Sequence, residues 1–403
     1  MGSAAKPSAR RVRFGDVVRL CTNRCVDPAA EGIERYVGLE HLEPGDLRVR
    51  KWGLVADGTT FTNRFKPGQV LFGKRRAYQR KVGVADFEGV CSGDIYVLEP
   101  ANGSLHPDLL PFLCQTDGFY EHAVGTSAGS LSPRTNWKSL ADFELVLPPL
   151  EEQARLGRLL AAVQGTSDAH HLLLDEAEQL KQAALAWFFG RGFDSDAQLQ
   201  RGQPAAVRFA SGIVKISEVA RVVRGSTPRP AGDPRYFNGN DVPWITVGDL
   251  TKDDWPFLDN TGTKLTSEGA ARSRFLPAGT VVLTNSGFSL GVPKILGIGG
   301  CTNDGVAAFL ELDARVDPEF LYYFLAGRTA YFRQVLAAGG DQPNLNTSRI
   351  GDVRIPIPSL ARQREIVKAL RDVDDQLRSA AARLMLTNKL RQDLLHLELG
   401  RRR

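Results

Sequence analysis

A short run of positive side chains surrounds one aromatic ring at residues 73–83, GKRRAYQRKVG. The run holds five cations and one tyrosine: Lys74, Arg75, Arg76, Arg80, Lys81 and Tyr78. Positive charge beside an aromatic ring suits contacts with DNA phosphates, because the ring remains available for a sugar or a base. A solvated charged loop is the commoner explanation of such a run. The density of charge and the glycines at both ends favour DNA binding.

Three glycine-rich loops carry polar side chains of the kind that can read bases. They are GTSAGSLSPRTN at 125–136, TNSGFSLG at 284–291 and GGDQPNLNTSR at 339–349. Asn and Gln can form paired bonds to adenine, and Arg to guanine, in the major groove. For any single residue, a turn side chain that bonds its own backbone is the commoner explanation. These loops and the dispersed cations supply the remaining candidate DNA-binding residues: Ser130, Arg134, Asn136, Arg224, Thr227, Lys252, Lys264, Arg274, Asn285, Ser286, Lys294, Gln342, Asn344 and Asn346.

Catalytic motifs are absent from the sequence. It contains no G-x-x-x-x-G-K-[ST] phosphate loop, no G-x-G-x-x-G after a strand and no H-E-x-x-H. The LPPL at 147–150 is not the Asn/Asp-Pro-Pro-aromatic motif with which an amino methyltransferase grips a flipped base. Cys21 and Cys25 have no second pair of ligands nearby, which argues against a structural zinc site. We therefore expect no catalytic residue, no metal and no cofactor in this chain.

The composition is that of an ordinary globular protein. Of the 403 residues 42% are hydrophobic and 24% are charged, and such a length predicts two or three domains. No apolar run is long enough to span a membrane, and no secretory signal stands at the N-terminus. The odd, scattered cysteines predict a reducing cytoplasm. The net charge of +5 favours an acidic partner such as nucleic acid, but only weakly.

One long segment occurs twice, at a fixed offset of 210 residues. The first copy opens LPPLEEQARLGRLLAAV at Leu147, and the second opens IPSLARQREIVKALRDV at Ile357. The identical pairs, kept in register without a gap, include Pro148/Pro358, Leu150/Leu360, Gln153/Gln363, Leu160/Leu370, Val163/Val373, Leu180/Leu390, Gln182/Gln392, Leu185/Leu395 and Gly190/Gly400. So many matches indicate an internal repeat.

Each copy predicts one helix of about 40 residues, roughly 60 Å long. Apolar residues spaced four and three apart form a seam typical of helices that pair along their length. We expect the two copies to pair antiparallel. The seam and partner-interface candidates are Leu156, Leu160, Val163, Leu173, Leu180, Trp187, Ile366, Leu370, Val373, Leu377 and Leu384. Thr166, His170 and His171 interrupt the seam, which indicates either a kink or solvated stretch or a groove for a partner helix.

The rest of the chain follows the same duplicated plan. Residues 11–147 and 211–357 both predict short strands between glycine turns, with helices near the end. They flank helices at 148–190 and 358–400, and a polar linker at 191–210 separates the halves. The predicted fold is α+β: two similar domains separated by two long antiparallel helices and related by a pseudo-two-fold axis.

The chain resembles the specificity subunit of type I restriction-modification systems over nearly its whole length. The resemblance is carried by the duplicated helix openings at Pro148 and Pro358, by residues 66–94 and 224–250, and by GGDQPNLN before the second helix. It implies two target-recognition domains, each reading one half of a split DNA sequence. It also implies that the helices dock two methyltransferase subunits, which carry S-adenosylmethionine, and that a motor-nuclease restriction subunit can join.

The resulting hypothesis is a non-catalytic DNA reader and scaffold in the cytoplasm. One rival is a protein scaffold of a phage-defence complex that does not read DNA. Another is a stand-alone nuclease, which would need clustered carboxylates that the sequence does not show.

Overall fold

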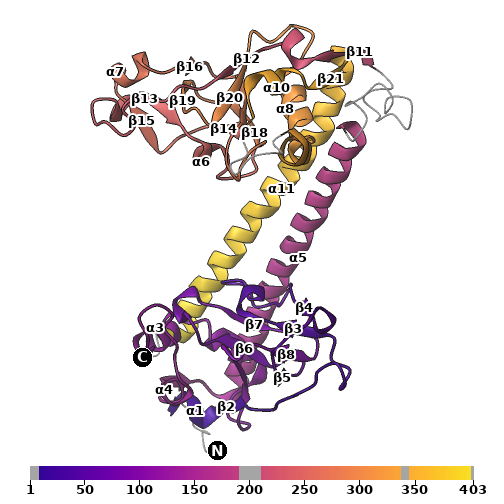
Figure 1. Ribbon diagram of the computed structural model, residues 1–403. Coiled ribbons are helices and arrows are strands. Elements are labelled where there is room, and N and C mark those ends of the chain that lie inside the picture. The colour runs from indigo at the N-terminus through magenta and orange to yellow at the C-terminus, as the bar shows by residue number, and fades with distance from the viewer. Residues whose placement is uncertain (1–8, 190–209, 337–344, 401–403) are drawn as a thin grey trace, which may run out of the picture. The chain divides into compact units, whose positions relative to one another are not determined.

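The computed structural model describes residues 9–189, 210–336 and 345–400, and it divides into two compact units. Unit 1 consists of Met1–Leu172 and Ala381–Arg403, and unit 2 of Leu173–Ala380. Each unit contains one globular domain and part of both long helices (Figure 1). Most of the expected linker at 191–210 lies outside the described residues.

The first domain is built on two four-stranded sheets. One has the order β2 (Val18–Cys21), β9 (Ile95–Pro100), β6 (Val70–Gly73), β7 (Val82–Val84) and is antiparallel throughout. The other has the order β4 (Gly53–Leu54), β3 (Arg35–Val37), β8 (Gly89–Cys91), β5 (Asn63–Phe65), with β3 and β8 parallel. Short helices complete the domain: α1 (Phe14–Val17), η1 (Leu39–His41), η2 (Val55–Asp57), η3 (Ala77–Gln79), η4 (Pro107–Leu109), α2 (Leu110–Leu113), α3 (Asp117–Gly125) and α4 (Trp137–Ala141).

Two apolar clusters hold the first domain together. Phe14, Phe72 and Phe119 belong to a cluster that joins the first sheet to the helices. Phe65 and Val97 belong to a second cluster, which involves strands of both sheets. Along β9, Tyr96 and Leu98 pack in the first cluster and Ile95 and Val97 in the second, so this strand faces the helices on one side and the other sheet on the other.

The second domain repeats this topology. Its first sheet has the order β12 (Arg221–Arg224), β20 (Val306–Leu310), β17 (Val281–Thr284), β18 (Pro293–Leu296), with β14 (Phe257–Leu258) added at the edge. Its second sheet has the order β15 (Thr263–Leu265), β13 (Phe237–Ile245), β19 (Gly300–Thr302), β16 (Phe275–Leu276), with β13 and β19 parallel. The helices are η6 (Ile216–Glu218), α6 (Val247–Leu250), α7 (Ser267–Ala271), α8 (Pro318–Ala326), α9 (Thr329–Tyr331), η7 (Phe332–Leu336) and α10 (Thr347–Gly351).

Each domain begins and ends at one strand pair that leads into a long helix. β1 (Arg10–Arg13) pairs antiparallel with β10 (Glu144–Leu147), directly before α5 (Leu150–Phe189). β11 (Ala210–Lys215) pairs antiparallel with β21 (Arg354–Pro358), directly before α11 (Leu360–Leu395), which a final π-turn, η8 (His396–Gly400), follows. The internal duplication read from the helices therefore extends to the order of the strands. In the described part of the chain, none of the helices combines the length and apolar character needed to cross a membrane.

The repeated glutamine fixes the start of each helix to its own domain. Gln153 accepts a hydrogen bond from the backbone N–H of His106 at 2.9 Å, and its amide donates to the carbonyls of Ser104 and Pro148 at 3.0 and 2.8 Å. The side chain of Gln153 is almost fully buried, so its amide group needs these hydrogen-bond partners.

Gln363 repeats the arrangement in unit 2. It accepts from the backbone N–H of Asp317 at 2.8 Å and donates to the carbonyls of Arg315 and Pro358 at 2.7 and 2.8 Å. The conservation of all three contacts across the repeat gives the glutamine in the duplicated helix opening a structural role.

The two long helices run antiparallel within each unit. In unit 1 the hydroxyl of Ser167 donates to Asn388 at 3.2 Å. Arg155, on the preceding part of α5, lies 4.0 Å from Glu398 of η8, which follows α11. In unit 2 Lys181 forms an ion pair with Asp374 at 2.7 Å. Residue numbers along α5 rise as their partners along α11 fall, which confirms the predicted antiparallel pairing.

The predicted seam is correct for α11 but shifted for part of α5. Leu156, Leu160, Ile366, Leu370 and Val373 are buried as predicted, and Val163, Leu377 and Leu384 are half-buried. Leu173, Leu180 and Trp187 are about half-exposed or more, so their prediction as residues of the seam between α5 and α11 was wrong, while a contact with a partner protein stays a prediction. The buried residues in this part of α5 are Ala177, Lys181 and Leu185. Lys181 can be buried because Asp374 of α11 forms an ion pair with it.

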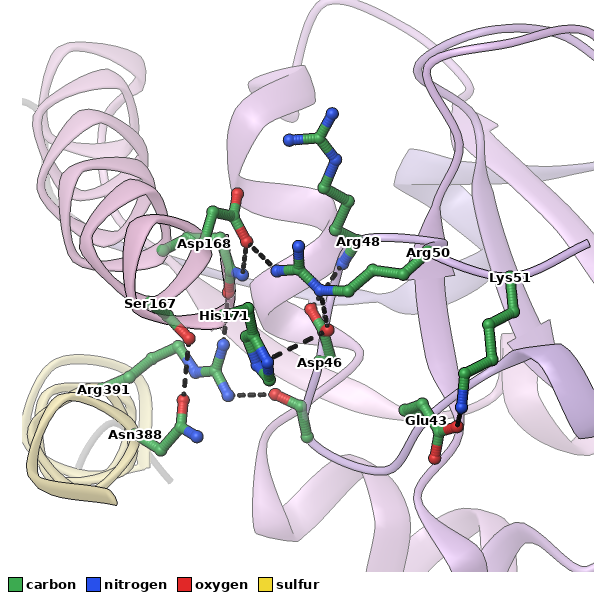
Figure 2. A network of polar contacts seen from close by, with 12 residues as sticks. Glu43, Asp46, Arg48, Arg50, Lys51, Ser167, Asp168, His171, Asn388 and Arg391 are labelled. Carbon is green, nitrogen blue, oxygen red and sulfur yellow. Dashed lines mark hydrogen bonds and ion pairs between the residues drawn. The ribbon is translucent and has the colours of Figure 1, made fainter. Parts of the chain in front are cut away.

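The polar interruption of α5 is a junction with the first domain (Figure 2). The helix continues without a break through residues 165–171. Arg50 joins Asp46 and Asp168 at 2.6 and 2.5 Å, and His171 lies 3.7 Å from Asp46. Of the three polar residues that looked like a kink or a groove, His171 faces the charged loop at 45–50, whereas the hydroxyl of Thr166 donates to the carbonyl of Ala162 in the same helix.

Candidate nucleic-acid interface

Two of the predicted DNA-binding segments lie side by side in the first domain. The loop after β6 turns sharply, with Arg76 and Arg80 in left-handed backbone conformation at either end of η3. The N–H of Arg76 donates to the carbonyl of Pro133 at 2.7 Å, and the N–H of Thr135 donates to the carbonyl of Lys74 at 3.0 Å. The basic loop and the loop at 126–136 therefore form one surface.

A single carboxylate holds two arginines of this surface. Arg75 lies 3.2 Å and Arg134 2.8 Å from Asp94, and Arg75 also donates to the hydroxyl of Ser132 at 3.1 Å. Partial burial acts to raise the pKa of Asp94, but hydrogen bonds from Arg134 and Arg75 outweigh it and hold that pKa below its usual value. The trio keeps one net positive charge and a fixed geometry, which suits a phosphate better than two mobile side chains would.

The side chains of two of the remaining cations of the basic loop are bonded to neighbouring residues, and that of one is not bonded to any described residue. Arg80 forms an ion pair with Asp117 at 2.6 Å, and Lys81 donates to the carbonyl of Leu39 at 2.7 Å, so both brace the loop. Arg76 and Tyr78 are exposed. Among the described residues no hydrogen bond or ion pair engages the side chain of Arg76. Arg76 and Tyr78 are therefore the residues of the run that are most available to a ligand.

Lys74 lines a crevice of about 480 Å³ at the end of the first sheet. Its ammonium lies 4.7 Å from the centre of the Tyr96 ring. The crevice contains a second cation and several hydrogen-bonding side chains: Thr22, Arg24, Thr60, Thr62 and Asn63. No carboxylate lines it, so its charge suits an anionic ligand such as a DNA strand.

The side chains of Asn136 and Asn346 bond to nearby backbone N–H groups, which was the alternative explanation to base contact. The side-chain oxygen of Asn136 accepts from the backbone N–H of Ser139 at 2.9 Å and caps α4. Asn346 accepts from Arg349 at 2.8 Å and caps α10 in the same way. The side-chain oxygens of both residues are engaged in helix capping, while base contact by their amide N–H groups stays a prediction.

The prediction of Lys294 as a DNA contact was wrong. Its side chain is only 2% exposed, and its ammonium donates to the carboxylate and the carbonyl of Asp253, each at 2.8 Å. A lysine inside a fully buried strand needs such partners, and it cannot reach a phosphate. Asn285 is also fully buried, and its side-chain amide has no hydrogen-bond partner among residues 9–189, 210–336 and 345–400.

The other candidates of the second domain fall into three groups. Arg224, Thr227 and Arg274 border the loop of Asp304, where Arg224 donates to the Asp304 carbonyl at 2.5 Å and Thr227 N–H to its carboxylate at 2.8 Å. Lys252 and Lys264 are exposed, and Ser286 is half-buried. In the first domain, the candidate Ser130 is exposed. Gln342 and Asn344 lie outside the described residues. Among the described residues, no group of three His, Cys, Asp or Glu side chains could hold a metal ion.

Comparisons with known proteins match this architecture. Residues 211–384 match the model of the type I restriction modification DNA specificity domain. The chain is 21% identical over 430 residues to the MjaVIII specificity subunit of Methanocaldococcus jannaschii, which covers 94% of this chain and 92% of that protein. It is 27% identical over 185 residues to the MjaIX specificity subunit of the same organism, which covers 45% of this chain and only 42% of that protein.

The fold agrees with a solved structure of the same kind. The type I restriction-modification S subunit from M. genitalium superposes with a TM-score of 0.61 at 14% identity, over 98% of this chain and 96% of that one. Residues 211–384 therefore carry a type I restriction modification DNA specificity domain, and nearly the whole chain is similar to the specificity subunits of type I restriction-modification systems. These similarities are consistent with recognition of a DNA target.

The sequence analysis missed one conspicuous residue of the second domain. Phe288 is fully exposed in the loop after β17. It stands in the segment TNSGFSLG, of which only Asn285 and Ser286 were considered. The available signal was a bulky aromatic residue one position after Gly287, which has a positive φ of 75° and so marks a tight turn at the surface.

Proposed function

We propose that this chain reads a DNA target made of two separate half-sites, one for each domain. The single observation that carries the proposal is the repeated strand order of the two domains, which gives one chain two similar recognition heads. The sequences of the two loops after β6 and β17 differ almost completely, so the half-sites differ too. Contacts to phosphates fix the position of a protein on DNA, and side chains at base edges select the sequence.

We further propose that the outward faces of the long helices bind two methyltransferase subunits. On α5 in unit 2, Leu180 and Trp187 are 53% and 64% exposed. In unit 1, the residues 210 positions later, Leu390 of α11 and Leu397 of η8, are exposed as well. Exposed apolar residues at repeated positions of a helix are typical of an interface with another protein. Since the positions are duplicated, two copies of one partner would fit them.

In this proposal the chain itself performs no catalysis. The methyl donor S-adenosylmethionine and the reaction belong to the methyltransferase subunits, and a motor-nuclease subunit joins where a host encodes one. The complex works in the cytoplasm, where host DNA lies.

The test is base-modification sequencing of host DNA with and without this gene. If the proposal holds, a motif of two short halves around a fixed gap loses its methylation when the gene is deleted. If no motif changes while methyltransferase subunits still co-purify with the chain, the exposed helix faces support the rival function, a protein scaffold that does not read DNA.

A further inference from the structure

The same hairpin of both domains exposes an aromatic ring. The loop at 74–81 joins β6 to β7, and the loop at 285–292 joins β17 to β18. These strand pairs hold the same place in the two sheets, and the loops have the same length. Tyr78 is 55% exposed in the first loop and Phe288 fully exposed in the second.

The two loops share little else. The first reads KRRAYQRK and the second NSGFSLGV, so charge, glycine content and side-chain size all differ. An aromatic ring in water is unfavourable because its apolar surface stays hydrated. A ring that both loops expose despite their divergence therefore points to a ligand that both domains share.

Each loop is held firmly at its base, so the ring stands on a rigid support. In the first domain the N–H of Arg76 is bonded to Pro133, and Arg80 is paired with Asp117. In the second, the carbonyl of Leu290 accepts from Arg333 at 2.7 Å, and the hydroxyl of Thr329 donates to the carbonyl of Gly291 at 2.8 Å. Such anchoring lowers the entropy cost when the ring binds a ligand.

The charges beside Tyr78 favour DNA as that ligand. Arg76 is exposed two residues away, and Arg75 and Arg134 are held together at Asp94 next to the same loop. A ring among cations matches the alternation of bases and phosphates along a strand. A protein partner would gain from the apolar ring but would have to compensate this charge.

We infer that the rings of Tyr78 and Phe288 stack on base faces in the two half-sites. The inference rests on the proposed reading of a two-part DNA target. A ring can reach a base face only where the stack is opened, and methylation opens it because the target base must leave the helix. The ring then fills part of the vacated space, as apolar wedges do in other DNA-binding proteins, and it favours the open state.

The experiment compares Tyr78→Ala and Phe288→Ala with the conservative variants Tyr78→Phe and Phe288→Tyr in the methyltransferase complex. Val26→Ala is the matched control, because Val26 is an exposed apolar residue of the first domain outside these loops. Methylation is measured separately in each half-site by base-modification sequencing. A 2-aminopurine base at the methylated position reports extrusion by its rise in fluorescence in the purified complex.

The expected result is a loss of methylation rate and of extrusion with each alanine variant, strongest in the half-site that the altered domain reads. Stacking on one base contributes about 1–3 kcal/mol, so the loss should be about 5- to 150-fold. The conservative variants and Val26→Ala should behave as the unaltered chain does.

Two outcomes would overturn the inference. In one, the alanine variants methylate and extrude the target base normally. In the other, the methyltransferase subunits no longer co-purify, which would make the rings a protein-docking surface. If the unaltered chain itself directs no split motif, the proposed function has failed, and this result is distinct because it appears before any substitution.

Discussion

Lys181 of α5 and Arg391 of α11 are equivalent residues of the repeat, and both carry a buried positive charge between the two helices. They stand 210 positions apart. Lys181 pairs with Asp374, which also accepts a hydrogen bond from the hydroxyl of Tyr323 at 2.7 Å. Arg391, only 1% exposed, bonds to Gln164, the residue 210 positions before Asp374. One contact therefore occurs twice, with the helices exchanged.

The two copies have diverged in charge. Gln164 is neutral, and Arg391 also donates to the carbonyl of Gly45 in the first domain. Burial lowers the pKa of Arg391, while the charges of Asp46 and Asp168 oppose this. Unit 2 thus has a compact ion pair, and unit 1 has the wider network that includes Arg50 (Figure 2).

Replacing Lys181 by Met should destabilise unit 2 strongly. The substitution leaves the carboxylate of Asp374 buried without its partner charge, which typically costs about 3–5 kcal/mol. The midpoint of guanidinium unfolding measures the effect. The triple variant Lys181→Met, Asp374→Leu and Tyr323→Phe removes the whole polar group, and it should recover most of the loss. If the single variant unfolds at the normal midpoint, the ion pair does not contribute as described.

Gln153→Ala and Gln363→Ala should destabilise the chain by similar amounts. Each removes a buried amide group that accepts from the half-buried backbone N–H of His106 or Asp317, and leaving a buried hydrogen-bonding group unsatisfied costs about 1–3 kcal/mol. Thermal unfolding with both variants tests this. Gln182→Ala is the control, since Gln182 is exposed and donates to Glu178 one turn away within the same helix. A change in the control as large as in the others would show that glutamine loss acts through helix propensity.

Arg76→Ala should weaken DNA binding for all sequences and reduce the salt slope of the binding constant by about one unit. The side chain is exposed, so the fold should not change. Arg75→Ala should in addition loosen the loop, because Arg75 is held by Asp94 and Ser132. A salt titration of binding to random duplex DNA separates the two effects. An unaltered slope with Arg76→Ala would remove that arginine from the interface.

Stability at acid pH should depend on Asp94. Its pKa is lower in the folded chain than its ordinary value of 3.8, so it contributes stability above that value. The contribution is lost as the pH falls below 3.8 through the folded pKa, because the protonated carboxyl no longer attracts Arg75 and Arg134. Asp94→Asn should lack this part of the pH dependence. Unfolding midpoints between pH 3 and pH 6 provide the measurement, and equal slopes for both proteins would contradict it.

Leu180→Asp and Leu390→Asp should separate the chain from its methyltransferase subunits without unfolding it. Both leucines are about half-exposed, so a charge there meets water in the free chain but an apolar surface in the complex. Co-purification and circular dichroism measure the two properties. Val26→Asp serves as the control, because Val26 is exposed in the first domain and off the helices. Normal co-purification of both variants would exclude these positions from the interface.

The sequence predicted the duplication well because identical residues at a fixed offset do not depend on the environment. It placed part of the α5 seam wrongly because a hydrophobic pattern assumes that buried positions are apolar. Ser167 and Lys181 are buried instead, each opposite a polar residue of α11. Only knowledge of the partner helix reveals such positions.

Only part of the candidate interface could be predicted, because the sequence does not show which residues the charged side chains contact. The basic loop was found from its charge, but charge alone did not distinguish exposed Arg76 from Arg75, which Asp94 holds. Lys294 was misjudged because its partner Asp253 lies on a distant loop. The strand PKIL around it is buried at every position, which was the one warning in its neighbourhood.

The buried polar contacts between the helices restrict how their length can evolve. Unit 1 has its own contact at Ser167 and Asn388, and unit 2 has one at Lys181 and Asp374. An insertion into α5 between Ser167 and Lys181 would leave one of these contacts out of register unless α11 gained the same number of residues. Viable length variants of this lineage should therefore arise as matched insertions or deletions in both helices, and single ones should be rare among its descendants.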